Sequence, residues 1–256
     1  MSLTRSFKTP GMATLLARRT FTRDGENTRT NPDVSGNPNL KPEIATGLDL
    51  AVERYLPQGG VLSASAFHRR VQNLIRNTLT PPEQDAYHRW VSRPTNISEA
   101  ITEGIELEAK FGLKQWIDEA PAVDLRSNVS FYRSRVLSID GPDNRLDQQP
   151  NMTANLGADY RLRSVPLTVG GNVNYNPGYT TRSSDVQWLT VSQKRVMDVY
   201  GLWRVDSSTA WRLTLSNLNP LAYQSNSLYS SNGFVENSNT QSRSWTNVQI
   251  LLEKKL

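Results

Sequence analysis

The chain has 256 residues, of which 29 are basic and 24 are acidic, and it contains no cysteine. The net charge of +5 is spread along the sequence, which argues against a nucleic-acid partner, and the lack of cysteine excludes disulfides, thiolate metal sites and thiol nucleophiles. No run of 18 apolar residues exists, so a membrane-spanning helix is excluded, whereas a membrane-spanning β-barrel is not, because its strands alternate apolar and polar residues.

The N-terminal residues lack the basic and apolar regions of a secretion signal. For a membrane barrel this predicts that the chain is part of a longer protein. Residues 4–10 already read like the end of a strand, so residues 1–3 are interpreted as an added start that precedes the native sequence.

Apolar and polar residues alternate in several runs, which predicts β-strands with one apolar and one polar face. In residues 152–162 the apolar side chains take the even positions, and in residues 167–175 they take the odd positions. In chain order the runs are residues 105–113, 123–131, 152–162, 167–175, 211–215 and 248–253. Helical spacing would not produce this order.

The predicted connections alternate between short and long. The short ones are residues 57–60, 114–122, 163–166 and 206–208, and the long ones are residues 11–42, 79–98, 138–149, 181–188 and 219–241. Short turns at one end and long loops at the other are typical of an outer-membrane barrel, whose turns face the periplasm and whose loops face outward. A soluble antiparallel meander remains an alternative interpretation.

A more specific signal lies in residues 36–43, which read GNPNLKPE and lead into TGLDLA. This segment resembles the NPxLKPE motif of TonB-dependent outer-membrane receptors, where it ends a long outer loop and begins a descending strand. Weaker matches follow the family order, namely RSFKTP at 5–10, SAFHRRVQNLI at 65–75, TEGIELE at 102–108, QPNM at 149–152, and LSNL at 215–218 followed by Tyr223. Asn151 stands where the family usually has histidine.

The resemblance implies that residues 1–256 are the C-terminal portion of such a receptor, an all-β, antiparallel transmembrane β-barrel segment of about ten strands with short periplasmic turns and long extracellular loops. The resemblance also implies that the plug domain and about half of the 22 strands of such a barrel lie outside this chain. Family members usually end in Phe or Trp, whereas this chain ends in Leu256, which keeps the apolar parity of the last strand.

No catalytic motif is present, so the chain is not expected to be an enzyme. His68 and His88 stand apart from each other and from acidic clusters, and neither a metal site nor a cofactor is expected. Glu106 and Glu108 fall on a polar strand face and are expected to line the lumen rather than to act as a glycosidase pair. The arginines on other polar faces, Arg126, Arg161 and Arg212, are expected to neutralise them.

The candidate ligand residues lie in the long loops. Tyr87, His88, Arg89 and Trp90 combine two aromatic rings with two potential cations, which suits stacking on a planar anionic iron chelate. Arg18 and Arg19 would add positive potential. The alternative is that these side chains contact lipopolysaccharide phosphates or solvent.

The resemblance implies a ligand-gated importer in the outer membrane of a Gram-negative bacterium. Its expected partners are the TonB system, a ferric siderophore or similar small ligand, and outer-membrane lipid and lipopolysaccharide. A ferric siderophore is the expected cargo because it is the commonest in the family, with cobalamin, haem and oligosaccharide left open. Two other classes also remain open: a soluble or surface-displayed all-β binding or adhesion module, and a passive porin.

Overall fold

The computed structural model describes residues 1–23 and 25–255. In this part of the chain ten antiparallel strands form one continuous path, which confirms the predicted fold class. In spatial order they are β1 (Ser2–Lys8), β4 (Glu43–Leu56), β5 (Gly60–Thr80), β6 (Val91–Gly112), β7 (Val123–Val136), β8 (Met152–Arg161), β9 (Leu167–Asn176), β12 (Lys194–Arg204), β13 (Thr209–Ser216) and β16 (Asn247–Lys254). Leu256, which the sequence predicts to continue the apolar face of the last strand, lies outside the described residues.

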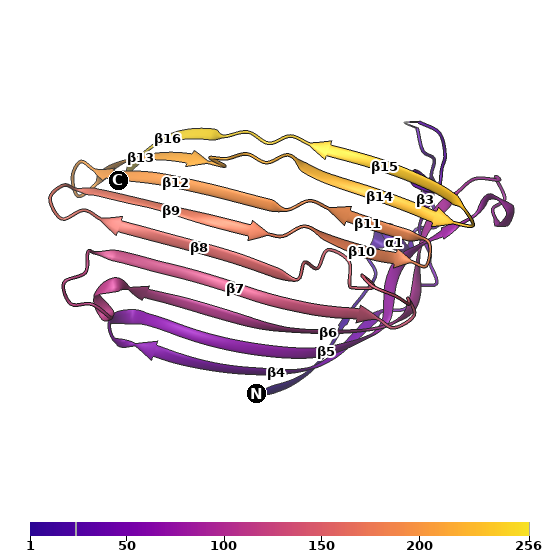
Figure 1. The fold of residues 1–256 in the computed structure, drawn as a ribbon, viewed down its shortest axis with the longest axis horizontal. Helices are drawn as coiled ribbons and strands as arrows, with labels where there is room; N and C mark the ends of the chain where they lie inside the picture. Colours follow the sequence, from indigo (N-terminus) through magenta and orange to yellow (C-terminus); the bar gives the residue numbers. More distant parts are fainter. Residues whose placement is uncertain (24, 256) are drawn as a thin grey trace.

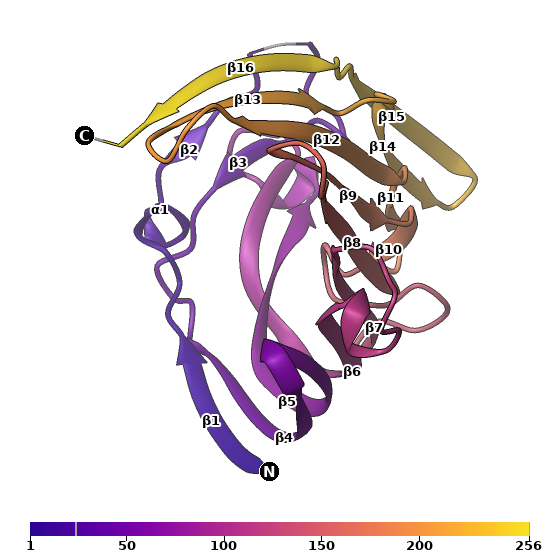
Figure 2. The same ribbon diagram turned by 90° about the vertical axis from the view of Figure 1, so that its left-hand side faces the viewer.

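The sheet is strongly curved (Figure 1). Seen from its short-turn end, it curls in an open arc with β1 at one edge and β16 at the other (Figure 2). The predicted short turns are present, and two of them contain the short helices η1 (Pro57–Gly59) and η3 (Leu113–Gln115). Within the described residues, no helix combines the length and apolar character that crossing a membrane requires.

Two predicted loops are hairpins in the structure. Residues 181–188 lie mostly in β10 (Tyr179–Ser184) and β11 (Gln187–Val191), and residues 219–241 contain β14 (Tyr223–Ser231) and β15 (Phe234–Ser242). These four strands form a second antiparallel sheet that continues the wall beyond β9, β12, β13 and β16 (Figure 1). These strands were not predicted from the sequence, because Asn, Ser and Thr occupy both of their faces and no apolar alternation marks them.

The predicted loop 79–98 was too long. The strands β5 and β6 contain 21 and 22 residues and pair as far as Thr80 and Val91. The true connection is therefore residues 81–90, which contain the helix η2 (Pro82–Gln84). Backbone pairing extends the two strands, and residues 92–98, which read SRPTNIS, show no alternation of apolar and polar side chains that would have predicted this.

The long connection from β1 to β4 contains the helix α1 (Met12–Leu15) and two short strands, β2 (Arg19–Thr20) and β3 (Asp33–Ser35). The strand β3 pairs antiparallel with β2 and parallel with β6, with Asp33 opposite Val91. The pairing of β3 with β6 therefore attaches this connection to the long-loop end of the sheet.

Large apolar side chains are exposed on one face of the sheet, as the alternation predicted. Leu50, Ile105, Leu156 and Ile250 are 47%, 52%, 52% and 69% exposed. A small buried cluster of Leu74, Ala100, Val136 and Ile139 lies instead at the long-loop end. A continuous apolar face of this kind marks a surface that meets an apolar environment.

Candidate functional site

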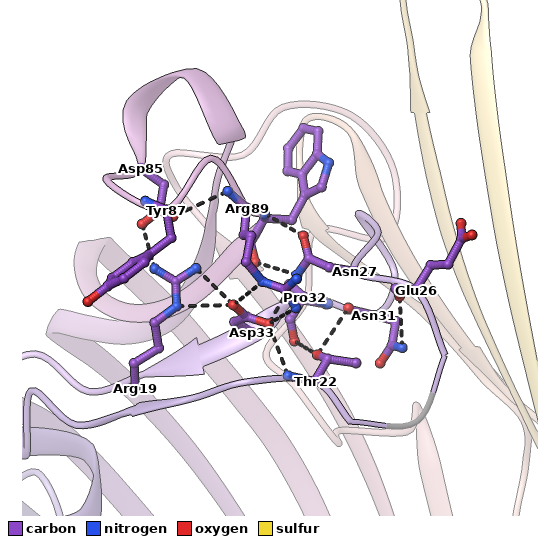
Figure 3. A network of polar contacts seen from close by, with 11 residues as sticks. Arg19, Thr22, Glu26, Asn27, Asn31, Pro32, Asp33, Asp85, Tyr87 and Arg89 are labelled. Carbon is purple, nitrogen blue, oxygen red and sulfur yellow. Dashed lines mark hydrogen bonds and ion pairs between the residues drawn. The ribbon is translucent and has the colours of Figure 1, made fainter.

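Four of the six predicted ligand residues come together at the long-loop end (Figure 3). Arg19 begins β2, and Tyr87, Arg89 and Trp90 lie in the connection between β5 and β6. Asp33, the first residue of β3, holds them together, and its backbone N–H donates to the Trp90 carbonyl at 2.9 Å. We call this group the Asp33 cluster.

The Asp33 carboxylate is fully buried and accepts six hydrogen bonds. Arg19 donates from Nε at 3.0 Å and from Nη2 at 2.8 Å, and Arg89 donates from Nε at 2.8 Å and from Nη2 at 2.9 Å. The Thr22 amide and the Asn27 side chain donate at 3.0 and 3.2 Å. A buried carboxylate is stable only with such partners.

The electrostatics of the cluster keep both carboxylates ionised. The Arg89 hydrogen bonds, with those of Thr22 and Arg19, hold the pKa of Asp33 well below its usual range, although burial opposes them. Asp85 accepts from Arg19 Nη1 at 2.7 Å, which lowers the pKa of Asp85. Two guanidinium cations thus face two carboxylates, and the cluster is internally neutral.

Three of the six candidates have exposed side chains. The guanidinium carbon of Arg19 lies 4.8 Å from the centre of the Tyr87 ring, and Tyr87 as a whole is 64% exposed. His88 and Arg18 are also exposed. Tyr87, His88 and Arg18 are therefore the candidates whose side chains face solvent, while Arg19 and Arg89 bind the chain's own carboxylates.

The β1–β4 connection, which carries Arg19 and Asp33, also contacts the β14–β15 hairpin. The guanidinium carbon of Arg29 lies 3.9, 4.6 and 5.2 Å from the ring centres of Phe234, Trp90 and Tyr229. The next residue, Thr30, donates its backbone N–H to Glu236 at 2.8 Å. These contacts, which we call the loop clasp, join the β1–β4 connection to the β14–β15 hairpin.

A cavity of about 590 Å³ lies where β9 and β12 give way to the second sheet. Its cationic side chains are Lys194, Arg195 and Arg243, and its aromatic ones are Tyr179 and Tyr223. No acidic residue is among the described residues that line it. Burial raises the pKa of Tyr179, so its hydroxyl stays protonated and can donate a hydrogen bond. We call this cavity the rim pocket.

Sequence reasoning missed the rim pocket. Lys194 and Arg195 begin β12, and Arg243 lies just beyond β15. Lys194 and Arg243 are far apart in the sequence, and the chain between them folds back so that both line the same cavity. The alternation of β12 could have placed Lys194 on the polar face, but nothing in the sequence near Arg243 indicates its neighbours.

The inner face carries paired charges, with partners that differ from the prediction. Arg126 pairs with Asp159 at 2.8 Å, and Tyr200 donates to the same carboxylate at 2.6 Å. Arg161 and Arg212 pair with Asp124 and Glu253. The three arginines therefore do not neutralise Glu106 and Glu108, because aspartates and Glu253 on neighbouring strands lie closer to them. Glu106 instead accepts a long hydrogen bond of 3.5 Å from Tyr132.

Comparison with known proteins gives a family match and one curated relative. The family model described as "TonB dependent receptor-like, beta-barrel" matches residues 1–240. The vitamin B12 transporter BtuB of Vibrio vulnificus is 38% identical over 77 residues, which cover 30% of this chain and 11% of that protein.

Solved structures share the fold. A mutant of the ferric enterobactin receptor PfeA from Pseudomonas aeruginosa, in complex with enterobactin, superposes with a TM-score of 0.57 and 17% identity, covering 86% of this chain and 32% of that chain. The siderophore receptor PirA from Pseudomonas aeruginosa gives 0.57 and 16%, covering 85% and 35%. This chain thus spans about a third of the length of these structures.

Proposed function

The chain belongs to the TonB-dependent receptor β-barrel family, and we propose that it is part of an outer-membrane receptor that imports a ferric siderophore by TonB-coupled gating. In this mechanism the ligand binds at the outer loops, and the TonB system supplies the energy that opens a path through the barrel. This chain contributes wall, loops and charged groups, and no covalent bond is made or broken.

Family membership confirms several expectations. The members are transport receptors in the outer membrane of Gram-negative bacteria and not enzymes. The exposed apolar face is then the surface that meets lipid. Family membership argues against the soluble module and the passive porin, because the members of this family are ligand-specific transport receptors.

The observation that carries the choice of cargo is the composition of the rim pocket. Its three cations have no carboxylate among the described lining residues, in contrast to the neutral Asp33 cluster. Cations without internal partners favour an anionic ligand, and the Tyr179 and Tyr223 rings favour a planar aromatic one. A ferric complex of an aromatic, anionic chelator combines both properties.

The exposed loop residues support the same cargo. Tyr87, His88 and Arg18 have exposed side chains, which an arriving ligand can reach. The Asp33 cluster holds the backbone that carries Tyr87 and His88. We assign initial contact to these exposed residues and assign anchoring of the loop to Arg19 and Arg89.

Cobalamin is the second candidate, because the relative with the higher sequence identity is a vitamin B12 transporter. That match spans 77 residues, less than a third of this chain, so it does not determine the cargo. Cobalamin does not need a strongly cationic pocket. Charge removal in the rim pocket therefore separates the two cargoes.

The test is an uptake assay in cells that carry the intact gene for this chain. Lys194→Gln combined with Arg243→Gln should lower the affinity for a ferric tris-catecholate by about tenfold or more, the effect of losing charge-assisted hydrogen bonds. Lys114→Gln, at the short-turn end, is the matched control and should leave uptake unchanged. Cobalamin uptake with no ferric chelate uptake in the wild type would overturn the proposal.

A further inference from the structure

Arg76 of β5 is a cation in the interior of the long-loop end. Its side chain is only 3% exposed. A buried guanidinium is stable only when it is paired with an anion and its N–H groups have acceptors. Arg76 belongs neither to the Asp33 cluster nor to the lining of the rim pocket, so a different set of residues must hold it.

The five N–H groups of the Arg76 guanidinium match five contacts with oxygen atoms. Nε donates to Asp147 Oδ2 at 3.2 Å, and Nη2 lies 2.8 Å from Oδ1 of the same carboxylate. Nη2 also donates to the Arg145 carbonyl at 2.6 Å. Nη1 donates to the Arg182 and Ser183 carbonyls at 3.2 and 3.4 Å. We call these five residues the Arg76 junction.

The first segment that the junction joins is the β7–β8 loop, residues 137–151, which is fixed to the sheet. Leu146 packs against the buried cluster at the long-loop end. Arg145 and Asp147 flank Leu146 in the sequence, so the packing of Leu146 holds both of their acceptor groups in place. On this side the junction therefore has a fixed base.

The second segment is the β10–β11 hairpin, which contacts the same loop. The Arg182 backbone N–H donates to the Asp143 carbonyl at 2.6 Å, and the Arg182 side chain donates to the Asp140 carbonyl. Gly141, with a φ of +89°, leaves room for the Arg182 guanidinium, because a Cβ at this position would collide with it. Thr181 is 1% exposed, so this part of the hairpin is covered. The hairpin is thus attached to the loop by main-chain and side-chain contacts.

The base of this hairpin is one wall of the rim pocket. Tyr179, the first residue of β10, pairs with Val191, the last residue of β11, and both line the pocket. Arg182 is three residues from Tyr179 on the same strand, a distance of about 10 Å. Burial raises the pKa of Tyr179 most, and the charge of Asp147 adds to this shift while that of Arg145 opposes it. A displaced junction would therefore move this wall and change its charge environment.

We propose that Arg76 is a positioning residue for the rim pocket, because it holds the β10–β11 hairpin, and with it Tyr179, in the arrangement that binds an anionic ligand. The inference rests on the proposed function of the rim pocket, and Arg76 acts on the ligand only through the hairpin. Arginine supplies five donors in a planar fork, whereas lysine would keep the charge but could not serve both the loop and the hairpin.

The experiment uses the whole receptor and compares the wild type with Arg76→Gln, Arg76→Lys and Arg93→Gln. Arg93 of β6 is exposed and pairs with Thr78, two residues from Arg76 on β5. Arg93→Gln is therefore a matched control, which removes the same kind of charge at the same end of the sheet. Heat-dependent gel mobility checks that each barrel is folded.

The first measurement needs no ligand. The fluorine resonance of 3-fluorotyrosine incorporated at position 179 reports the surroundings of the pocket wall in the purified receptor. It should shift or broaden in Arg76→Gln, and it should keep its wild-type position in Arg93→Gln. Arg76→Lys should lie between the two.

The second measurement is the uptake of a ferric tris-catecholate by cells. The KM should rise about tenfold in Arg76→Gln with Vmax unchanged, as expected when about a tenth of the molecules hold the binding arrangement. A role in folding alone would lower Vmax and leave KM unchanged. Arg93→Gln should keep both wild-type values.

An unchanged Tyr179 resonance in the folded Arg76→Gln receptor would overturn the proposal, and so would an unchanged KM. If the wild type takes up no ferric tris-catecholate, the proposed cargo fails, and the resonance alone then decides. A changed resonance in Arg76→Gln with an unchanged one in Arg93→Gln would still support the positioning role, whereas equal spectra would refute it.

Discussion

The Arg89 guanidinium binds the Asp33 carboxylate through both of its oxygens, from Nε to Oδ2 at 2.8 Å and from Nη2 to Oδ1 at 2.9 Å. This bidentate pair joins two connections that are far apart in sequence. Because Asp33 is fully buried and Arg89 is partly covered, water does not replace the contact easily. The position of the outer loop therefore depends on one carboxylate.

Asp33→Asn should release this loop without unfolding the sheet. The substitution leaves Arg19 and Arg89 without their shared anion, and breaking a buried pair in this way costs about 3–5 kcal/mol. Hydrogen exchange of residues 19–35 and 81–91 should become much faster in the variant. Asp85→Asn removes the ion pair with Arg19 but keeps an amide oxygen that can accept from the backbone N–H groups of Tyr87 and Arg89, so it should have a smaller effect. Unchanged exchange in Asp33→Asn would show that the cluster does not hold the loop.

The pH dependence of the loop follows from the sign of the Asp33 shift. The pKa of Asp33 is lowered in the folded state from an ordinary value of 3.8. The stability that ionised Asp33 gives to the loop is therefore complete above the unfolded pKa, and it is lost as pH falls through the folded pKa. Loop protection should therefore be constant from neutral pH down to about pH 5, and it should weaken only below about pH 4. Hydrogen exchange corrected for intrinsic rates at each pH measures this. Loss of protection between pH 7 and 5 would contradict it.

Strand parity predicted the barrel wall well, because lipid on one side and water on the other force alternation. The exposed residues Leu156 and Ile250 lie on the face that the sequence assigned to them. The hairpins β10–β11 and β14–β15 carry Asn, Ser and Thr on both faces of their strands, so apolar alternation did not mark them.

The candidate site was predicted only in part, for a related reason. Tyr87, Arg89 and Trp90 form one short loop, so composition alone found them. Asp33 and Lys194 owe their importance to partners that strand pairing brings close. Asp33 is next to β6 only because β3 pairs parallel with it, and no local pattern predicts this pairing.

The loop clasp should couple the first outer connection to the β14–β15 hairpin. Arg29→Gln removes the cation from three aromatic rings, and desolvated cation–π contacts contribute about 2 kcal/mol. Exchange of the 229–236 segment should rise in Arg29→Gln and in Glu236→Gln, and a double-mutant cycle should show coupling between the two. Additive effects would mean that the loop and the hairpin move independently.

The last prediction tests the two faces of β6 at adjacent positions. Leu107 is 44% exposed and lies outward between Ala64 and Val129, whereas Glu108 lies on the inner face. Leu107→Lys places an ammonium group among lipid chains and should destabilise the receptor by about 2–4 kcal/mol if the site is near the bilayer midplane. Glu108→Lys puts the same group toward water in the lumen and should change stability by much less. Urea unfolding of the whole receptor in liposomes compares the two variants. Equal costs would mean that the outward face of β6 does not contact hydrocarbon, since only a difference in surroundings separates two lysines one residue apart.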